Sequence, residues 1–526
     1  MASNDERTLL RARLSREIGT LGIGRPSEVA LVYPSPYRAG MSSLGFQTLY
    51  RLLHELGIGA HRAFLPDVWE PMALPWPQPR RPILTYEAER PLSSYRVLGV
   101  SVAYELELAG LVRLLEGAGI PLLAADRGEH DPIIIGGGPL TFSNPSSILP
   151  FVDVLICGEA EDLLPDAVDR LLSHRRRGDA IAAASALPHT IAGEVEPGLW
   201  HDIPTPARAG KERVPARSAI LTPDTELADM FLIEPERGCS RQCAFCVMRI
   251  TPDGGMRLVE VEHVLELVPE HAKKVGLVGA AVTDHPDLEP LVASLVESGR
   301  SVSISSLRAD RLTPTFLRDM QRSGHRTITV ASDGISERMR QLLDRKIKEE
   351  HLLRAARLVH EHGFHRLKVY EMIGAPGETD ADVDELIRFA RELASIGRLA
   401  LTFSTFVAKR NTPLDGQPFL GVKEAEDRLR KIRAGLGGKV EIRPQSPRWA
   451  HIEYFLAQRG ADAGHATIKA VRAGARYADW VRAFAETPPT PRPLRFGDEA
   501  ALARRKGRAA ERPRKIGLPV LGAPPT

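Results

Sequence analysis

Short apolar segments alternate with amphipathic segments along the first 200 residues. Apolar runs typical of buried strands lie at residues 28–33, 60–65, 96–104, 132–137 and 152–158. Stretches with the helical spacing of apolar positions separate most of them, at 44–56, 109–118 and 161–172. Apolar strands separated by helices indicate a parallel sheet covered on both faces, which binds ligands at the carboxyl ends of its strands. The pattern predicts a doubly wound, Rossmann-like α/β domain over residues 1–200.

Residues 201–228 separate this region from a second one. They carry four prolines among charged and small residues, which is the composition of a linker. Further apolar runs predict strands at 231–235, 274–282, 302–307, 326–332, 366–374 and 399–407. Amphipathic stretches alternate with them, at 288–297, 314–322, 336–362 and 380–396. These strand–helix units predict an open, partial (β/α)6 barrel over residues 229–420, with its functional groups on the loops that follow the strands.

The remaining residues are predicted to form a cap and a tail. Helical spacing at 422–436 and 466–485 predicts a small, α-rich C-terminal cap over residues 421–487. Residues 488–526 are rich in proline and in basic residues, and 501–526 alone carry seven basic residues against one acidic residue. This composition is typical of a disordered, solubilising tail, and an arm that binds RNA or a partner is the alternative.

Composition and charge exclude several classes of protein. The 526 residues are 43% apolar and 26% charged, which excludes a wholly disordered or fibrous chain. The net charge of +3 gives no argument for a nucleic-acid partner. The longest uncharged stretch, 132–152, is interrupted by three internal prolines and three consecutive glycines, so we expect no membrane partner. The first twenty residues mix both signs of charge without an apolar core, so we expect no secretory signal and a cytoplasmic location.

The cysteines carry the most informative pattern. Three of the four lie within eight residues, in GCSRQCAFC, as Cys239, Cys243 and Cys246. They follow the first predicted strand of the second domain, where a barrel places its active site. Three thiolates can hold three irons of a cubane cluster and leave the fourth iron open to a ligand. A zinc site or inert thiols are the alternative, although no further cysteine or histidine pair follows at zinc-finger spacing.

This CxxxCxxC segment resembles the radical S-adenosylmethionine (radical SAM) superfamily, including the phenylalanine before the third cysteine. The resemblance extends to IGAPGE at 373–378, to TVASDGISERMR at 329–340 and to FVAKRNTPLD at 406–415. It implies a 4Fe-4S cluster that reductively cleaves S-adenosylmethionine to methionine and a 5′-deoxyadenosyl radical. It also implies a reductant such as flavodoxin or ferredoxin. The S-adenosylmethionine site it implies comprises Phe245, Gly279, Ser306, Arg308, Asp333, Gly374, Gly377 and Glu378.

Two features of that site stay open at the level of sequence. Glycine after a strand is usually only a turn, and Ser, Asp or Arg there usually caps a helix, so each residue alone is a weak signal. Many members of the superfamily also carry Gly-Gly-Glu after the second strand, which holds the methionyl amine. Here the segment reads VGAAVTDHP, so backbone carbonyls near Gly279 and Ala280, or Asp284, would replace the glutamate. His285 is either an acid or base facing the substrate or a residue that packs the loop.

The order of sheet domain, linker and cysteine barrel resembles the cobalamin-binding class of this superfamily. The resemblance rests on YPSPYRAGMSSLGFQ (33–47), GVSVAYELE (99–107), IIIGGGPLTFSNP (133–145), CGEAED (157–162) and SPRWAHIEYFLAQRG (446–460). It implies cobalamin lying against Ser101, Gly136, Gly137 and Gly138, whereas a glycine-rich turn of an ordinary doubly wound domain is the alternative. Tyr37 stands where the DxHxxG pattern has its cobalt-binding histidine, so cobalamin would bind without that ligand, or the domain has lost the cofactor. Cys157 is expected in the core.

The preferred hypothesis is a cobalamin-dependent radical SAM enzyme, most simply a methyltransferase acting on an unactivated carbon. A non-methylating radical SAM cyclase or rearranging oxidoreductase is the first alternative. An RNA-modifying radical SAM enzyme is the second, although nucleic acid is not the expected partner, and a non-catalytic iron-sulfur electron carrier is the third. The substrate, a small molecule or a peptide, is not identified by the sequence.

Overall fold

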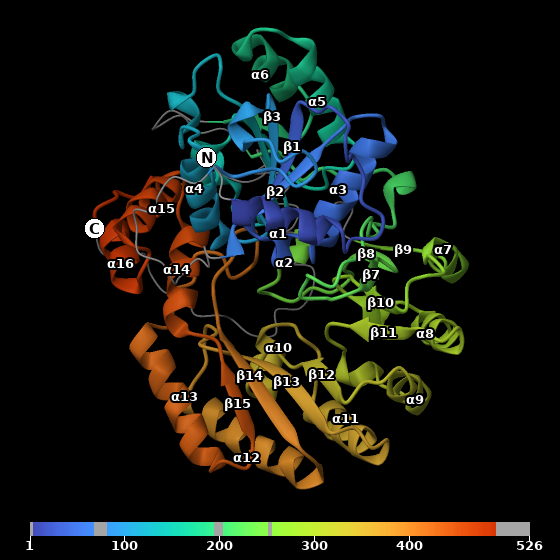
Figure 1. Cartoon of the computed structure of the whole chain (residues 1–526). Helices are drawn as coiled ribbons and strands as arrows, with labels where there is room; N and C mark the ends of the chain where they lie inside the picture. Colours follow the sequence, from blue (N-terminus) through green and yellow to red (C-terminus); the bar gives the residue numbers. More distant parts are fainter. Residues whose placement is uncertain (1–3, 68–81, 194–202, 251–254, 491–526) are drawn as a thin grey trace.

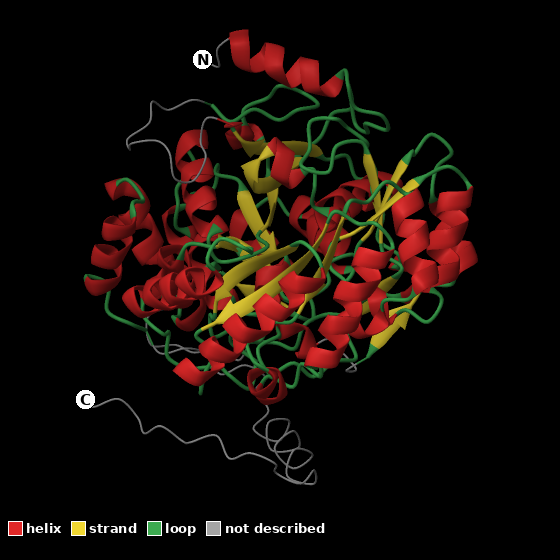
Figure 2. Cartoon of the chain, turned by 90° about the horizontal axis from the view of Figure 1, so that it is seen from below, coloured by secondary structure: helices red, strands yellow, loops and turns green. Residues whose placement is uncertain are grey.

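The structure is a computed structural model that describes residues 4–67, 82–193, 203–250 and 255–490. Figure 1 shows an upper unit formed by the N-terminal part of the chain and a lower unit with its strands directed toward the upper one. Seen from below, helices line the outside of the molecule and strands occupy its interior (Figure 2). No helix among the described residues has the length and apolarity needed to cross a membrane.

The upper unit is built on a twisted sheet of the predicted kind. Its strands are β1 Val29–Pro36, β2 His61–Leu65, β3 Val97–Ser101, β4 Ile133–Gly137, β5 Val154–Ile156 and β6 Thr190–Ala192. They are ordered β2-β1-β3-β4-β5-β6, and β1 to β5 are parallel, which confirms the predicted fold. The antiparallel edge strand β6 was not predicted, because its three residues form no apolar run.

Helices cover both faces of this sheet. They are α1 Asn4–Leu14, α2 Tyr37–Gly40, α3 Leu44–Glu55, α4 Glu107–Ala118, α5 Leu163–Ser173 and α6 Arg177–Ser185. Successive residues of β1 enter different cores, Val29 and Leu31 on one face and Ala30 and Val32 on the other. A Cβ atom at Gly110 of α4 would lie 1.9 Å from a carbonyl oxygen of β1, so glycine is required for this close approach.

The lower unit contains the predicted barrel strands in an open arrangement. Its main strands are β7 Met230–Ile233, β10 Lys274–Leu277, β11 Ser301–Ile304, β12 Thr327–Ala331, β13 Arg366–Ile373, β14 Leu399–Thr405 and β15 Glu441–Pro444. They form two parallel sheets, β11-β10-β7 and β12-β13-β14-β15, which are connected by a bridge between Leu307 and Val330. A short antiparallel pair, β8 Glu236–Gly238 and β9 Met256–Leu258, flanks the cysteines.

The helices of the lower unit lie on the outside of the strands. They are α7 Val261–Leu267, α8 Leu288–Glu297, α9 Pro314–Arg322, α10 Glu337–Leu342, α11 Glu349–Glu361, α12 Asp380–Ile396 and α13 Val422–Leu436. The single helical pattern at 336–362 is divided into α10 and α11. Asp344 and Lys346 adopt positive φ angles of 52° and 55° between them, which a helix does not accommodate.

The region predicted as a cap divides between the two units. Its first part, α13 and β15, extends the barrel, because β15 pairs in parallel with β14. The following helices are α14 Pro447–Gln458, α15 Asp462–Ala473 and α16 Tyr477–Ala485. Their apolar residues share one core with β3 and α4 of the upper unit. Of the predicted tail, residues 491–526 lie outside the part of the chain that the structure describes.

The segment predicted as a linker is packed rather than free where the structure describes it. Ile203, Ala216 and Ile220 are each at most 2% exposed. Ser218 donates its backbone N–H to Leu232 of β7 at 2.8 Å, so the segment runs along the edge of the barrel. Proline content signalled an irregular chain correctly, but burial depends on tertiary contacts that this composition does not encode.

Candidate active site

The three clustered cysteines lie on the loop after β8, at the carboxyl ends of the barrel strands. The backbone N–H of Arg241 donates to the Cys239 sulfur at 3.4 Å, and the N–H of Cys246 donates to the Cys243 carbonyl at 3.2 Å. The N–H of Ala244 donates to the carbonyl of Leu343, in the break between α10 and α11, at 2.9 Å. The interruption of the predicted helix therefore supports the cysteine loop.

Burial and a neighbouring thiol raise the pKa of two of the three cysteines. Burial raises the pKa of Cys239, and it raises that of Cys246 to about 11, with Cys243 adding to both effects. The Arg345 guanidinium lies 3.9 Å from the Cys243 sulfur. Among the described residues, no three His, Cys, Asp or Glu side chains converge on one metal ion. Each thiolate of a cubane site binds a different iron, so the three cysteines offer the ligands that such a cluster takes.

A buried glutamate that the sequence analysis missed lies beside this loop. Glu236 of β8 is 0% exposed, and its Oε1 accepts the N–H of Ala281 at 2.7 Å. Its Oε2 is buried and has no hydrogen-bond partner. A Cβ atom at Gly279 would lie 2.1 Å from Oε1, so glycine at this position makes room for the carboxylate. Burial raises the pKa of Glu236 to about 7. An unmet acceptor of this kind fits an ammonium group.

A buried guanidinium supplies the complementary charge. Arg308 is 5% exposed, and its Nη2 donates to Asp310 at 2.7 Å, whereas its buried Nη1 has no partner. Asp284 is already occupied by Arg241, at 2.5 Å, and by nearby Arg308, at 3.7 Å. Asp284 is therefore not available for the amine, and Glu236 replaces it as the candidate. Glu236 offers one free acceptor, and Arg308 offers two nitrogens without a hydrogen-bond partner, Nε and Nη1. An acceptor and donors of this kind match the ammonium and carboxylate of a methionyl group.

The other predicted S-adenosylmethionine contacts are arranged along the same strand ends. Asp333 has a φ angle of 60°, and its carboxylate forms an ion pair with Arg345, whose Nε lies 2.8 Å from it. Gly374 and Gly377 have φ angles of 77° and 81°, so both use conformations that favour glycine. Glu378 accepts the N–H of Gly374 at 2.8 Å and pairs with Arg428, so it holds the loop in shape.

Three further sequence candidates have less specific surroundings. Phe245 is partly buried and packs on the barrel core, and Ser306 is partly exposed on the turn after β11. His285 is 5% exposed, with Nε2 3.1 Å from the Val259 carbonyl and Nδ1 accepting the N–H of Asp287. His285 therefore packs the loop.

The edge of the upper sheet carries the predicted cobalamin contacts. Ser101, Gly137 and Gly138 are partly exposed at the ends of β3 and β4, whereas Gly136 is buried against Val152 and Leu155. A Cβ atom at Gly138 would lie 2.6 Å from the Val102 carbonyl oxygen, so the tight turn itself requires glycine.

Two further residues of the upper unit lie away from that edge. Tyr37 is fully buried, stacks on Tyr86 and donates to Glu17 at 2.5 Å, so it points into the core rather than toward a ligand. Cys157 is also fully buried, as expected.

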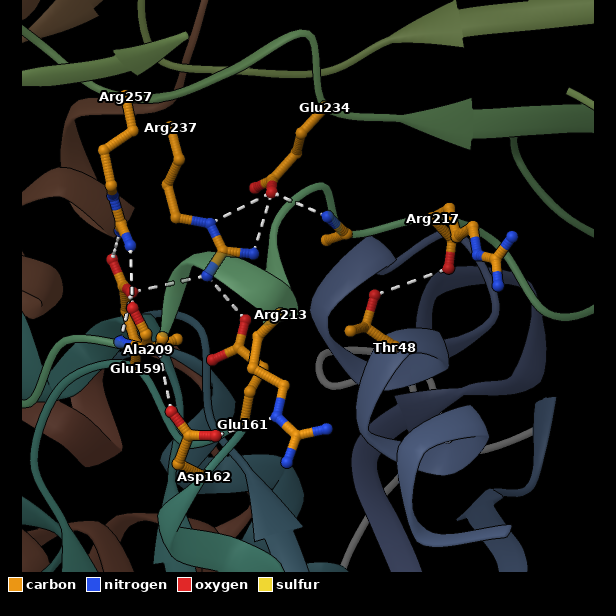
Figure 3. Close-up of polar contacts among 12 residues, drawn as sticks. Thr48, Glu159, Glu161, Asp162, Ala209, Arg213, Arg217, Glu234, Arg237 and Arg257 are labelled. Carbon is orange, nitrogen blue, oxygen red and sulfur yellow. Dashed lines mark hydrogen bonds and ion pairs between the residues drawn. The ribbon is translucent and has the colours of Figure 1, made fainter. Parts of the chain in front are cut away.

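A buried ionic network joins the two units next to the cysteines (Figure 3). Arg237, two residues before Cys239, contacts Glu161 at 2.6 Å, Glu234 at 2.8 Å and Glu159 at 3.4 Å. Glu159 and Glu161 belong to the loop after β5 of the upper sheet, and Arg257 also pairs with Glu159. The network therefore fixes the cysteine loop relative to the upper sheet.

A second ionic contact joins the units at the other side of the site. Lys409, after β14, lies 2.7 Å from Glu105, after β3, and 2.7 Å from Glu453 of α14. The carboxyl ends of both sheets therefore meet at one interface.

Comparison with known families identifies the class of protein. The model of the N-terminal part of radical SAM proteins matches residues 45–190, and the model of the radical SAM superfamily matches residues 233–390. The chain belongs to the radical SAM superfamily, as the cysteine motif indicated. The radical SAM domain implies a 4Fe-4S cluster at Cys239, Cys243 and Cys246, with S-adenosylmethionine beside it, and the residues described above fit both.

Individual relatives are more distant. The chain is 25% identical over 432 residues to the uncharacterized protein MJ0966 of Methanocaldococcus jannaschii, covering 78% of this chain and 85% of the relative. It is similar to the radical SAM methyltransferase TsrM from Kitasatospora setae with cobalamin and a 4Fe-4S cluster bound. The TM-score is 0.50 at 16% identity, over 76% of this chain and 78% of TsrM. TsrM with tryptophan substrate and the analogue aza-SAM bound gives the same TM-score and identity, over 76% of both chains. At this identity, the likeness to TsrM shows a shared fold.

Glu236→Gln tests the ammonium site. Glutamine keeps the shape but loses the charge, and hydrogen bonds to charged groups contribute about 1.5–3 kcal/mol, so KM for S-adenosylmethionine should rise at least about tenfold. Because the pKa of Glu236 is about 7, the wild-type carboxylate takes up a proton as pH falls through 7. Its KM should then rise at low pH, whereas the KM of Glu236→Gln should not follow this titration. Glu262→Gln on exposed α7 serves as the control, and equal KM values for both variants would exclude the assignment.

Proposed function

We propose that this chain is a cobalamin-dependent radical SAM enzyme that transfers a methyl group to an unactivated carbon of its substrate. The observation that carries the proposal is the meeting of the two carboxyl edges at one interface. Arg237 next to the cysteines and Lys409 after β14 both bind carboxylates of loops that follow strands of the upper sheet. A corrinoid on the upper sheet would therefore face the cluster and the S-adenosylmethionine site. The fold shared with TsrM, whose structure contains cobalamin, supports this placement.

The chain's own residues bind and orient the reactants. The cluster and S-adenosylmethionine, when bound, supply one-electron reductive cleavage, and cobalamin supplies methyl transfer. Glu236 and Arg308 would hold the methionyl ammonium and carboxylate, and Asp333 would accept from the ribose hydroxyls. Ser101, Gly137 and Gly138 have small side chains or none, which leaves room for a flat macrocycle against the upper edge. The position of Tyr37 supplies no imidazole ligand. The ionic contacts at the interface hold the two edges against each other.

Anaerobic reconstitution tests the proposal. The full chain should hold about four irons and about one cobalt when supplied with iron, sulfide and cobalamin. With S-adenosylmethionine deuterated at its methyl group, label should pass to the extracted corrinoid, as measured by mass spectrometry. Gly138→Val should hold less cobalt with unchanged iron, because a side chain there collides with Val102 and disturbs the edge.

Two outcomes would contradict it. Release of deoxyadenosine without cobalt or methyl transfer would favour the non-methylating cyclase or rearranging oxidoreductase. A redox-active cluster that never cleaves S-adenosylmethionine would favour an electron carrier.

A further inference from the structure

The inner face of the larger barrel sheet is polar. Successive residues of a strand point to opposite faces, and Leu367, Val369 and Leu401 lie in the core formed with the helices. The residues that alternate with them therefore occupy the inner face, and none of those named next is buried. Hydroxyl and basic groups prevail among them: Thr329, Lys368, Tyr370, Thr402, Ser404 and Arg443.

The register places these side chains in rows across the sheet. Tyr370 is opposite Thr402, which is opposite Arg443. In the next row, Lys368 is opposite Ala400, which is opposite Glu441. Neighbouring strands are about 4.8 Å apart, so the backbones of Lys368 and Glu441 are separated by about 10 Å. Ala400 between them carries no polar group, so it offers Lys368 no partner.

The positive charge of Lys368 is not neutralised within this face. Glu441 is the one carboxylate that β12 to β15, all of which the structure describes, place on the inner face. Glu441 already pairs with Arg366 and with Arg443, whose Nε lies 2.6 Å from it. Lys368 Nζ instead lies 3.3 Å from the Tyr370 hydroxyl and 4.7 Å from the centre of its ring. Lys368 therefore contacts a phenol and forms no ion pair among the described residues.

This cation lies beneath the S-adenosylmethionine site. The carbonyl of Tyr370 accepts the N–H groups of Ser332 and Asp333, at 3.0 and 3.1 Å, so Tyr370 supports the loop that carries Asp333. Tyr370 is three residues before the end of β13, which corresponds to about 10 Å along the strand. Because Lys368 Nζ reaches the Tyr370 hydroxyl, the charge lies at roughly this depth inside the open barrel.

We propose that Lys368, assisted by the Tyr370 hydroxyl, binds an oxyanion of the substrate. The oxyanion, a carboxylate or a phosphate, lies about 10 Å below the carboxyl end of β13 and level with the end of β12. The reaction takes place near these carboxyl ends. The substrate is then a small anionic molecule that enters the barrel with its charged end first. This inference rests on the proposed function, because it assigns the anion to the substrate of that reaction.

The test uses the full-length reconstituted protein and two probes, inorganic phosphate and glutarate, at constant ionic strength. Acylation of lysines is followed residue by residue by mass spectrometry. For the wild-type chain, the Kd of each anion is the concentration that gives half-maximal protection of Lys368 from acylation. We expect saturable protection of Lys368 and none of exposed Lys439. Lys368→Met should raise the Kd, measured by calorimetry, at least about tenfold, and Tyr370→Phe about fivefold. Lys368→Arg should retain binding, and Lys439→Met is the matched control.

The outcomes separate the possible anions and separate this inference from the proposed function. Protection by phosphate alone assigns a phosphate to the substrate, and protection by glutarate alone assigns a carboxylate. Absence of saturable protection at Lys368, or equal Kd values for Lys368→Met and Lys439→Met, overturns the inference. The footprint on the wild-type chain decides the question even if Lys368→Met fails to fold. Binding needs no turnover, so failure of methyl transfer counts against the proposed function only.

Discussion

Alanine in place of Cys239, Cys243 or Cys246 is expected to reduce cleavage of S-adenosylmethionine to background. Each thiolate binds a separate iron, so removal of one exposes a second corner of the cluster and the bound iron should fall from about four per chain toward zero. Burial raises the pKa of Cys246 to about 11, so iron binding at this position releases a proton that the free thiol retains at neutral pH.

Iron analysis and deoxyadenosine release measure this effect. Cys157→Ala is the control, because this thiol is fully buried in the upper core and lies away from the cluster loop. It should keep its iron and lose about 1 kcal/mol of folding free energy. A Cys246→Ala variant with full iron and normal cleavage would refute the cluster assignment.

Arg237→Met is expected to produce the largest loss of stability at the interface. The side chain of Arg237 is 11% exposed, and it contacts three carboxylates whose exposed fractions are 9%, 11% and 16%. Removal of one partner from a buried ionic group costs about 3–5 kcal/mol, because the remaining charges stay buried without compensation. The cysteine loop begins two residues later, so the loss should also reduce retention of the cluster.

Arg213→Met provides the matched control within the same network (Figure 3). Arg213 pairs with Asp162 at 2.8 Å, but their side chains are 26% and 39% exposed, so the pair should contribute less than about 1 kcal/mol. Denaturant unfolding, with hydrogen exchange at residues 159–162 and 234–238, measures both variants. Equal losses in the two variants would show that burial of the Arg237 network has no special effect.

Local pattern accounts well for the strands and poorly for the short or divided elements. The apolar runs marked the strands β1 to β5, because a strand buried on both faces must be apolar along its length, and they marked the main barrel strands by the apolar residues of the face that the helices cover. The pattern missed β6 and β15, which are short edge strands and pair with one neighbour each. It also joined α10 and α11, because the spacing of apolar residues continues through the break at 343–348.

The sequence by itself determined the two α/β units, the cysteine cluster and the superfamily, because these depend on residue type and on spacing over short distances. Tertiary structure alone decided which polar groups have no partner. Glu236, Arg308 and Lys368 resemble many other charged residues in the sequence, and only the fold leaves an oxygen of the first and a nitrogen of the second buried without a hydrogen bond. The contact of Arg345 with Cys243, and those of Arg237 with Glu159 and Glu161, also come from the fold, because these partners lie far away in the sequence. Burial and charge pairing arise from long-range contacts, which a linear pattern does not contain.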